Sequence, residues 1–334
     1  MIAAAGLDRL IGDPLWAPHP VEWMGKCIST LRSSVENWSG DQPLLLRIGG
    51  VAITLSLTLG SGCAGWLIER WALHTQGLLQ IIAIVALLAG LASALAARSL
   101  EHSVLKVISA LPSNKNGDLS AAREKLGWIV GRDTTSLGRN EILRAAAETA
   151  SENAVDGLFA PLFWMLVGAS LWSLGFSASP GPLALAWAFK AASTLDSMLG
   201  YRRGRLRWLG TAGARLDDLL TWLPCRLVML SLPMVSKPIW QWPATVIKAE
   251  SQGRHDASPN AGRSEAIYAH CAGVQLGGRN RYGDRWVDKD LLGADQPIAD
   301  RDGVIRILRL TQRLELLWLL AVAFCSWRLQ ASVQ

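Results

Sequence analysis

The chain has 334 residues, of which 50% are hydrophobic and 18% charged, and its formal net charge is +6. Soluble domains carry about a quarter charged residues, so this composition disfavours a water-soluble enzyme and excludes disordered, collagenous and disulfide-rich chains. An excess of basic over acidic residues fits either a nucleic-acid-binding protein or a membrane protein with basic loops. The five cysteines lack metal or redox spacing, and we expect them to be reduced apolar side chains.

Apolar segments predict the membrane-embedded part of the chain. Residues 48–68 and 77–97 are each uncharged for 21 residues, and about 20 helical residues cross a hydrocarbon core of about 30 Å. The short link between them predicts an antiparallel pair of helices. The other apolar segments are shorter, interrupted by prolines or flanked by charges: 157–176, 183–199, 219–240 and 307–327.

The distribution of lysine and arginine predicts the orientation. Residues 1–47, 98–156 and 200–218 are rich in these side chains, whereas the short links between the apolar segments have almost none. The positive-inside rule therefore places the N-terminus and these loops in the cytoplasm. If 219–240 crossed the membrane, the basic stretch 241–306 would lie outside. We therefore interpret 219–240 as a re-entrant or interfacial element, with a broken span as the alternative.

These features predict an all-α, polytopic integral membrane protein with about four to six membrane helices and large helical cytoplasmic loops. We treat 1–334 as a single membrane domain.

The first polar motif lies near the N-terminus, where Asp13 precedes a turn that holds His19 between Pro18 and Pro20. Prolines restrict this turn, which suits a histidine held as a ligand or general base. A rigid turn with a bystander histidine is the alternative.

The second polar motif, at 131–135, leads into a helix predicted over 140–156. Glu148, Glu152 and Asp156 recur every four residues along it, with Asn153 beside them. Like charges at this spacing destabilise a helix unless a cation or a cationic side chain neutralises them. The stripe therefore indicates either a Mg²⁺ site for a phosphorylated substrate or a solvated acidic face.

Further polar residues follow the later apolar segments. Asp217 and Asp218 begin the segment 219–240, and the nearby Arg215 and Arg226 could pair with them. A salt-bridge cluster and a metal site are equally good interpretations. The turn at 258–262 and the glycines of 273–278 would let backbone N–H groups approach a phosphate. The sequence has no Walker A or dinucleotide-binding pattern, so ATP would need a different kind of site.

Taken together, these blocks resemble the CbiB/CobD family, the adenosylcobinamide-phosphate synthases of cobalamin biosynthesis. The resemblance covers nearly the whole chain and six blocks stand in the family's order. They are GDPLWAPHPVEWMG at 12–25, GRDTT at 131–135, ETASENAVDGLFAPLFW at 148–164, TLDSMLGY at 194–201, ARLDDLLTWLPCR at 214–226, and SPNAG with GVQLGG at 258–278. This chain departs from the family pattern at two positions. Cys225 stands where the family more often has alanine, and Arg263 follows the SPNAG glycine, where the family often has an aromatic residue.

The resemblance implies an enzyme of the cytoplasmic membrane that uses ATP and Mg²⁺ to join adenosylcobyric acid to aminopropanol phosphate or a related amino alcohol. The implied partners are the corrinoid, the amino-alcohol phosphate, the lipid bilayer and other membrane enzymes of late cobalamin assembly. We expect no nucleic acid and no tightly bound organic cofactor. A non-catalytic membrane sensor of the same fold, similar to AmpE-type proteins, is the alternative.

The resemblance and the chemistry of amide formation assign roles to the polar residues. We expect His19 to act as the base, Asp133 to orient it or a substrate, and Glu152 to take part in catalysis. The expected metal ligands are Glu148, Glu152, Asp156, Asp217 and Asp218. The expected substrate- and phosphate-binding residues are Asp13, Arg132, Asn153, Asp196, Tyr201, Arg215, Arg226, Ser258, Asn260 and Gln275.

Overall fold

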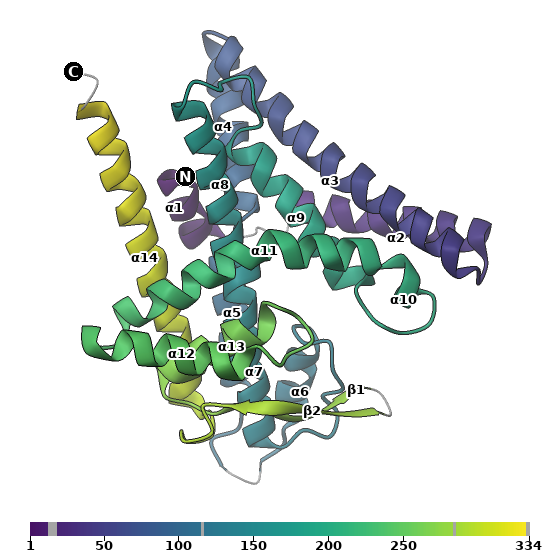
Figure 1. Ribbon diagram of the computed structural model, residues 1–334, viewed down its shortest axis with the longest axis vertical. Coiled ribbons are helices and arrows are strands. Elements are labelled where there is room, and N and C mark those ends of the chain that lie inside the picture. Colours follow the sequence, from purple (N-terminus) through teal and green to yellow (C-terminus); the bar gives the residue numbers. More distant parts are fainter. Residues whose placement is uncertain (13–18, 115–116, 283–284, 332–334) are drawn as a thin grey trace. The chain divides into compact units, whose positions relative to one another are not determined.

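Long helices with uncharged centres dominate the computed structural model (Figure 1), which describes residues 1–12, 19–114, 117–282 and 285–331. Among these residues, three helices are long and apolar enough to cross a membrane: Pro43–His74, Arg139–Ser173 and Thr211–Val235. The bent pair Leu78–Ser93 and Ala97–Ser109 is a fourth candidate. The prediction of a helical membrane protein is therefore confirmed, with the number of candidate spans at the lower end of the expected range.

The internal contacts divide the chain into two compact units, each built from sequence segments that lie far apart. Unit 1 comprises Met1–Arg98 and Asp156–Thr221, and unit 2 comprises Ser99–Val155 and Trp222–Gln334. Apolar segments contribute to both units. Two unit boundaries, after Arg98 and before Asp156, lie within two residues of the ends of the apolar segments 77–97 and 157–176, whereas the third, after Thr221, lies inside the segment 219–240.

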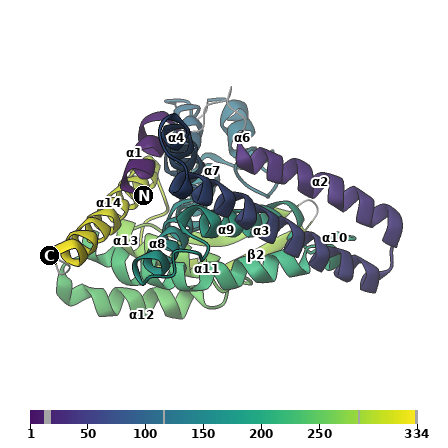
Figure 2. The ribbon, with the colours of Figure 1, turned by 90° about the horizontal axis from the view of Figure 1, so that it is seen from above.

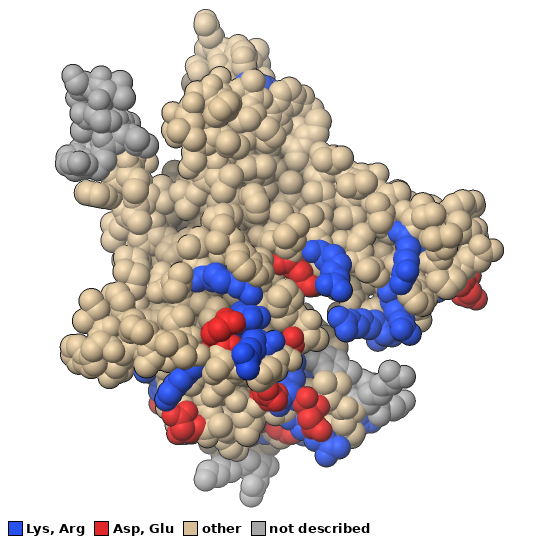
Figure 3. All heavy atoms as spheres, in the orientation of Figure 1, with Lys and Arg blue, Asp and Glu red and all other residues tan. Residues whose placement is uncertain are grey.

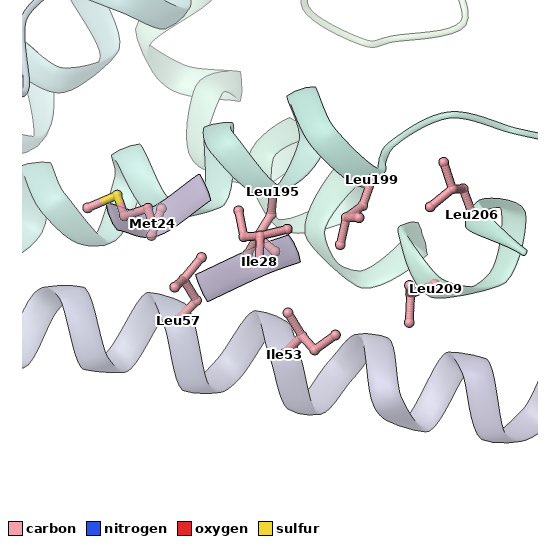
Figure 4. Close-up of a cluster of buried hydrophobic side chains, with 9 residues drawn as sticks. Met24, Ile28, Ile53, Leu57, Leu195, Leu199, Leu206 and Leu209 are labelled. Atoms are coloured by element: carbon pink, nitrogen blue, oxygen red, sulfur yellow. The ribbon is translucent and has the colours of Figure 1, made fainter. Parts of the chain in front are cut away.

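Unit 1 is helical and its core lies between α2, α3, α9 and α10. The helices of this unit are α1 (Ile2–Ile11), α2 (Pro20–Ser39), α3 (Pro43–His74), α4 (Leu78–Ser93), α8 (Ala160–Ser173), α9 (Pro182–Leu199), α10 (Leu206–Leu209) and the first half of α11 (Thr211–Ser231). Helices α3 and α9 lie side by side in both views (Figures 1 and 2). Buried aliphatic side chains such as Ile28, Ile53 and Leu195 fill the space between them (Figure 4). Each stabilises the fold by roughly 1.5–3 kcal/mol.

One face of α3 exposes large aliphatic side chains along the length of the helix. Leu44, Ile48, Val51, Leu55 and Leu59 are spaced three or four residues apart and are about half exposed or more. Residues at this spacing share one face of a helix. An exposed apolar stripe of this length, on a helix that is long and apolar enough to cross a membrane, fits a surface for lipid chains.

Two buried carboxylates cap helices in unit 1. Asp8 accepts a hydrogen bond from the N–H of Ala97, at the start of α5 (Ala97–Ser109), at 3.0 Å. Glu69 accepts from the N–H groups of Gly181 and Leu183, at the start of α9, at 2.9 and 2.6 Å. The first N–H groups of a helix have no partner within the helix and carry partial positive charge. These two acids are therefore structural.

Helix α11 continues through a proline because a tryptophan side chain donates a hydrogen bond to the backbone carbonyl that the proline, which has no N–H, leaves without its helical partner. Pro224 lies inside the helix and has no N–H to offer the carbonyl of Leu220, four residues earlier. The indole N–H of Trp164 donates to that carbonyl at 3.1 Å. The interruption expected within 219–240 therefore comes after Ser231, where the 3₁₀ turn Leu232–Val235 (η2) begins.

Unit 2 combines helices with one β-hairpin. Its elements are the rest of α5, α6 (Ser120–Gly127), α7 (Arg139–Ala154), the rest of α11, η2, η3 (Ile239–Gln241), α12 (Trp242–Gly253), α13 (Ala261–Ala272), β1 (Leu276–Tyr282), β2 (Arg285–Leu292) and α14 (Arg301–Ala331). The strands pair antiparallel, with an irregular register between Leu276 and Gly278. This hairpin is a departure from the all-α prediction.

Candidate functional site

Helix α7 carries a buried cluster that fastens the hairpin to it, hereafter the arginine–glutamate cluster. Glu148 accepts hydrogen bonds from the guanidinium of Arg132 and, at 2.9 Å, from the N–H of Gly277. Arg144, one helical turn before Glu148, lies 3.8 Å away and donates to the Gly277 carbonyl. Arg132 also donates to the side chain of Asn280. The cluster therefore neutralises the first carboxylate of the acidic stripe with two arginines.

The two glycines of β1 are required by this arrangement. Gly277 and Gly278 have φ values of +80° and +89°, which L side chains rarely adopt. A Cβ atom at Gly277 would lie 2.0 Å from the carbonyl oxygen of Asp290, and one at Gly278 would lie 2.7 Å from the guanidinium of Arg144. These glycines accommodate a β-bulge and a close arginine, and the Gly277 N–H is bonded to a carboxylate and not directed at open space.

A second buried cluster, hereafter the acid–lysine cluster, joins β2 to α13. The ammonium of Lys289 lies 2.8 Å from Asp256 and 3.5 Å from Glu265. Glu265 is 2% exposed, and its Oε2 has no hydrogen-bond partner among the described residues. Glu152 of α7 acts electrostatically on both Lys289 and Glu265.

Opposing effects set the protonation of this cluster. Burial raises the pKa of Glu265, and the Lys289 ammonium opposes that shift. Burial lowers the pKa of Lys289, but the carboxylates of Glu265 and Asp256 more than offset this and raise it above its usual range. Lys289 is therefore charged at neutral pH. By formal charge, the cluster sets the carboxylates of Asp256, Glu265 and Glu152 against one ammonium, so it is net negative whether or not Glu265 holds a proton.

The turn at 258–262 is held by two arginines. Arg226 donates to Asn260 Oδ1 at 2.5 Å and to the Pro259 carbonyl at 3.0 Å. Arg263 donates to the same carbonyl at 2.8 Å and forms a two-bond ion pair with Glu250. Arg263, which departs from the family pattern, therefore has a structural partner. Arg226 therefore contacts this turn, whereas the sequence predicted that it binds a phosphate or pairs with the aspartates of α11.

Three other predicted residues of unit 2 stabilise local turns. Asp133 accepts hydrogen bonds from the N–H and hydroxyl of Thr135, and the hydroxyl bond is the larger cause of its lowered pKa. The Ser258 hydroxyl accepts from the N–H of Asn260 at 3.2 Å. The side chain of Gln275 donates to the Ala294 carbonyl at 3.4 Å.

His19 is the N-cap of α2 in unit 1. Its Nδ1 accepts a hydrogen bond from the N–H of Val21 at 3.3 Å. In a neutral imidazole, a nitrogen that accepts leaves the proton on the other nitrogen. The Val21 bond therefore assigns the proton to Nε2, and His19 would have to break this bond to act as a base through Nδ1.

The remaining predicted residues of unit 1 lie near the ends of α9 and α11. Asp196 and Asp218 are close enough to repel each other electrostatically, and Asp217 is buried. Arg215 is exposed, and Tyr201 is 39% exposed with the guanidinium of Arg203 over its ring. Asp13 lies outside the described residues.

The acidic stripe does not continue regularly to its third member. Helix α7 ends at Ala154, and the π-helical turn Val155–Phe159 contains Asp156. A π turn holds more residues than an α turn, so the backbone around Asp156 is wider than that around Glu152. Asn153 is exposed. Asp156 belongs to unit 1 and Glu152 to unit 2.

One expected metal ligand already has other partners. Glu148 accepts from Arg132 and from a backbone N–H, which argues against a metal bound at this carboxylate. Within the described ranges, no group of three His, Cys, Asp or Glu side chains is arranged to hold a metal ion. The other expected ligands, Glu152, Asp156, Asp217 and Asp218, are divided between the two units, and their role as metal ligands stays a prediction.

Sequence reasoning missed several residues of the two clusters. Arg144 had a signal, because it lies four residues before Glu148 on one helix and such pairs face each other. Asn280, Glu265 and Lys289 had none, because only the pairing of the hairpin with α7 and α13 brings them into place.

Comparison with known proteins agrees with the order of the sequence motifs. Residues 1–311 match the model of the family described as CobD/CbiB protein. A Synechocystis protein named "Cobalamin biosynthesis protein CobD" is 42% identical over 87% of this chain and 80% of its own length. A Salmonella typhimurium protein named "Cobalamin biosynthesis protein CbiB" is 36% identical over 91% of this chain and 89% of its own. No solved structure matches the chain.

Proposed function

The chain belongs to the CobD/CbiB protein family, and we propose that it is an adenosylcobinamide-phosphate synthase of cobalamin biosynthesis. The reaction joins a carboxylate of adenosylcobyric acid to the amine of an amino-alcohol phosphate, (R)-1-amino-2-propanol phosphate or a related compound. The product is an amide. The relatives named above are all cobalamin biosynthesis proteins, and they do not favour a non-catalytic sensor.

The chemistry requires activation of the carboxylate. A carboxylate does not react with an amine at neutral pH, so the proposal includes ATP as co-substrate. The carboxylate attacks the γ-phosphorus of ATP, which gives an acyl phosphate and ADP. The amine then attacks the acyl carbon, phosphate leaves, and the amine loses a proton. Mg²⁺ enters this proposal with ATP, as part of the substrate.

The observation that supports this substrate class best is the separation of charge along α7. The arginine–glutamate cluster has two arginines for one carboxylate, a net charge of +1. One turn further, Glu152 contributes to the net negative acid–lysine cluster. An amino-alcohol phosphate is a zwitterion with an anionic phosphate at one end and a cationic ammonium at the other, so it complements clusters of opposite charge.

In this proposal the two clusters receive opposite ends of the amino-alcohol phosphate. Arg132 and Arg144 attract the phosphate, and Glu152 holds the ammonium and accepts one of its protons before attack, which frees the nitrogen lone pair. His19 serves as a hydrogen-bond donor through Nε2. The other predicted residues, including Arg215 and the aspartates of α9 and α11, remain candidates for contacts with the corrinoid or ATP.

We also propose that the protein lies in the cytoplasmic membrane with its basic loops in the cytoplasm. The basic stretches 98–156 and 200–218 support this orientation. Both the corrinoid and ATP would then reach the site from the cytoplasm. Other membrane enzymes of late cobalamin assembly are the proposed partners.

Complementation tests the proposal in cells. A host that lacks this step should grow on cobyric acid when it carries this gene, and without the gene it should grow only on cobinamide. Growth of the complemented strain on cobinamide alone would contradict the synthase assignment.

A matched pair of variants tests the role of α7 in vitro. Membranes with the Glu152→Gln variant should lose synthesis of adenosylcobinamide phosphate, followed by mass spectrometry, while the protein still inserts. The exposed Glu124 of α6 offers a control with the same change, and Glu124→Gln should retain activity. Equal activity of both variants would exclude the proposed role of Glu152.

A further inference from the structure

Five exposed arginines of unit 1 lie near the start of α3 and in the segment that follows α9, and two of them stack on Trp208. We call this group the basic collar: Arg47, Arg202, Arg203, Arg205 and Arg207, with Trp208. Arg47 lies near the start of α3, and the others lie in the segment between α9 and α11. Helix α10 is beside the N-terminal part of α3 in both views (Figures 1 and 2), and Figure 3 shows basic side chains over this region.

In the collar, two arginines stack on the Trp208 ring and one forms an ion pair. The guanidinium groups of Arg47 and Arg207 lie 4.5 and 5.0 Å from the centre of the Trp208 ring. Arg205 pairs with the exposed Asp41 at 2.6 Å. Among the described residues, the other four arginines have no carboxylate within ion-pair distance. The collar therefore presents a positive charge that the protein leaves largely uncompensated.

The position of Arg47 on α3 places the collar at a membrane boundary. Residues 48–68 are uncharged, and Arg47 lies 23 residues before Arg70. At 1.5 Å per residue this is about 34 Å, close to the hydrocarbon thickness of about 30 Å. Arg70 likewise lies near tryptophans, 5.7 and 5.8 Å from the rings of Trp66 and Trp172. Arginine and tryptophan therefore mark both ends of this span, as expected at membrane interfaces.

The two ends of the span differ in charge. The collar has five arginines, whereas the last turns of α3 and the residues just after it, 69–76, contain Arg70 as their only lysine or arginine. Arg47 lies next to the exposed aliphatic stripe of α3, because Leu44 and Ile48, on either side of it in the sequence, belong to that stripe. A ligand at this position would place phosphate against guanidinium groups and hydrocarbon chains along the stripe.

From this geometry we propose that the basic collar is a binding site for the headgroups of anionic phospholipids. Guanidinium groups donate hydrogen bonds to phosphate oxygens, and basic residues at a membrane surface attract anionic lipids. The adjoining apolar stripe favours a lipid over a free phosphate. The site requires only that α3 spans the membrane, and it is independent of the proposed enzymatic activity.

The test measures retention of phosphatidylglycerol by the full-length protein in nanodiscs of phosphatidylcholine and phosphatidylglycerol. The triple variant Arg47→Gln, Arg202→Gln, Arg207→Gln should bind phosphatidylglycerol about 100-fold more weakly than wild type. The control replaces three exposed arginines of unit 2, Arg254, Arg301 and Arg309, by Gln. The control should retain the wild-type affinity.

Two further measurements do not depend on the folding of the Gln variant. Wild-type retention should fall as NaCl rises from about 0.05 to about 0.5 M, because salt screens exposed charges. The corresponding Lys variant should keep most of the binding. Three results would each overturn the proposal. They are retention that does not change with the salt concentration, an equal loss of binding in the collar and control variants, and displacement of the lipid by millimolar inorganic phosphate.

Discussion

The arginine–glutamate cluster predicts that a single neutral substitution will release the β-hairpin from α7. The change is Glu148→Gln, which keeps the shape of the side chain and its ability to accept from the Gly277 N–H. It removes the charge that faces two arginines. The side chains of Glu148 and Arg132 are each 7% exposed, and that of Arg144 is 15% exposed. Water can therefore compensate only in part for the lost carboxylate.

The size of the effect follows from this burial. Removing one partner of a buried ion pair costs about 3–5 kcal/mol, because the other charge is left uncompensated. Since glutamine still accepts one hydrogen bond, we expect the lower end, about 3 kcal/mol. If the hairpin opens locally, this corresponds to amide exchange about 150-fold faster in the peptides that cover 276–292. Hydrogen–deuterium exchange in detergent or nanodiscs measures this directly.

An exposed ion pair on the same hairpin provides the control. Arg279 and Asp288 lie 3.7 Å apart, with 63% and 81% of their side chains exposed. Exposed pairs contribute about 0–1 kcal/mol, so Asp288→Asn should change exchange less than about fivefold. If Glu148→Gln increased hairpin exchange no more than Asp288→Asn, the buried cluster would not be what holds the hairpin.

Three other predictions test the fold. Trp164→Phe should lower the thermal stability of the detergent-solubilised protein by leaving the Leu220 carbonyl unpaired, and adding Pro224→Ala should restore it; no rescue would show that the indole bond is unimportant. Gly277→Ala should disorder the hairpin, since its Cβ would clash with the Asp290 carbonyl; unchanged exchange over 276–292 would contradict this. Burial lowers the pKa of His270, so the unfolded chain gains a proton that the folded chain does not. Stability should therefore fall as pH drops below about 6.5, and His270→Gln should remove this dependence in a thermal melt recorded against pH.

The elements that the sequence predicts well are those set by local properties. Helices α3 and α4 follow from uncharged runs whose length and hydropathy are visible residue by residue. Helix α7 follows from its start after the 131–135 motif and its regular spacing. In each case the signal that marks the helix lies within one segment, so its position can be predicted without knowledge of the distant segments that pack against it.

The features that escaped prediction depend on contacts between distant segments. Gly277 and Gly278 suggest a loop that approaches a phosphate, but strand pairing turns them into a bulge against Arg144. The π turn at Val155–Phe159 has no signature in hydropathy. Pro224 predicted an interruption of α11, because the sequence does not reveal that Trp164 supplies the missing hydrogen bond.

The acidic stripe of α7 shows how one sequence pattern can serve two physical purposes. Like charges four residues apart require positive partners, and the sequence could not tell a bound cation from a side chain. For Glu148 the partners are arginines, one from its own helix and one from the preceding loop. For Glu152 the neighbouring charge is Lys289, whose ammonium also neutralises Asp256. Because the protein's own cations face both acids, a metal is not the only source of positive charge for the stripe, and an incoming ammonium would compete with Lys289 for Glu152.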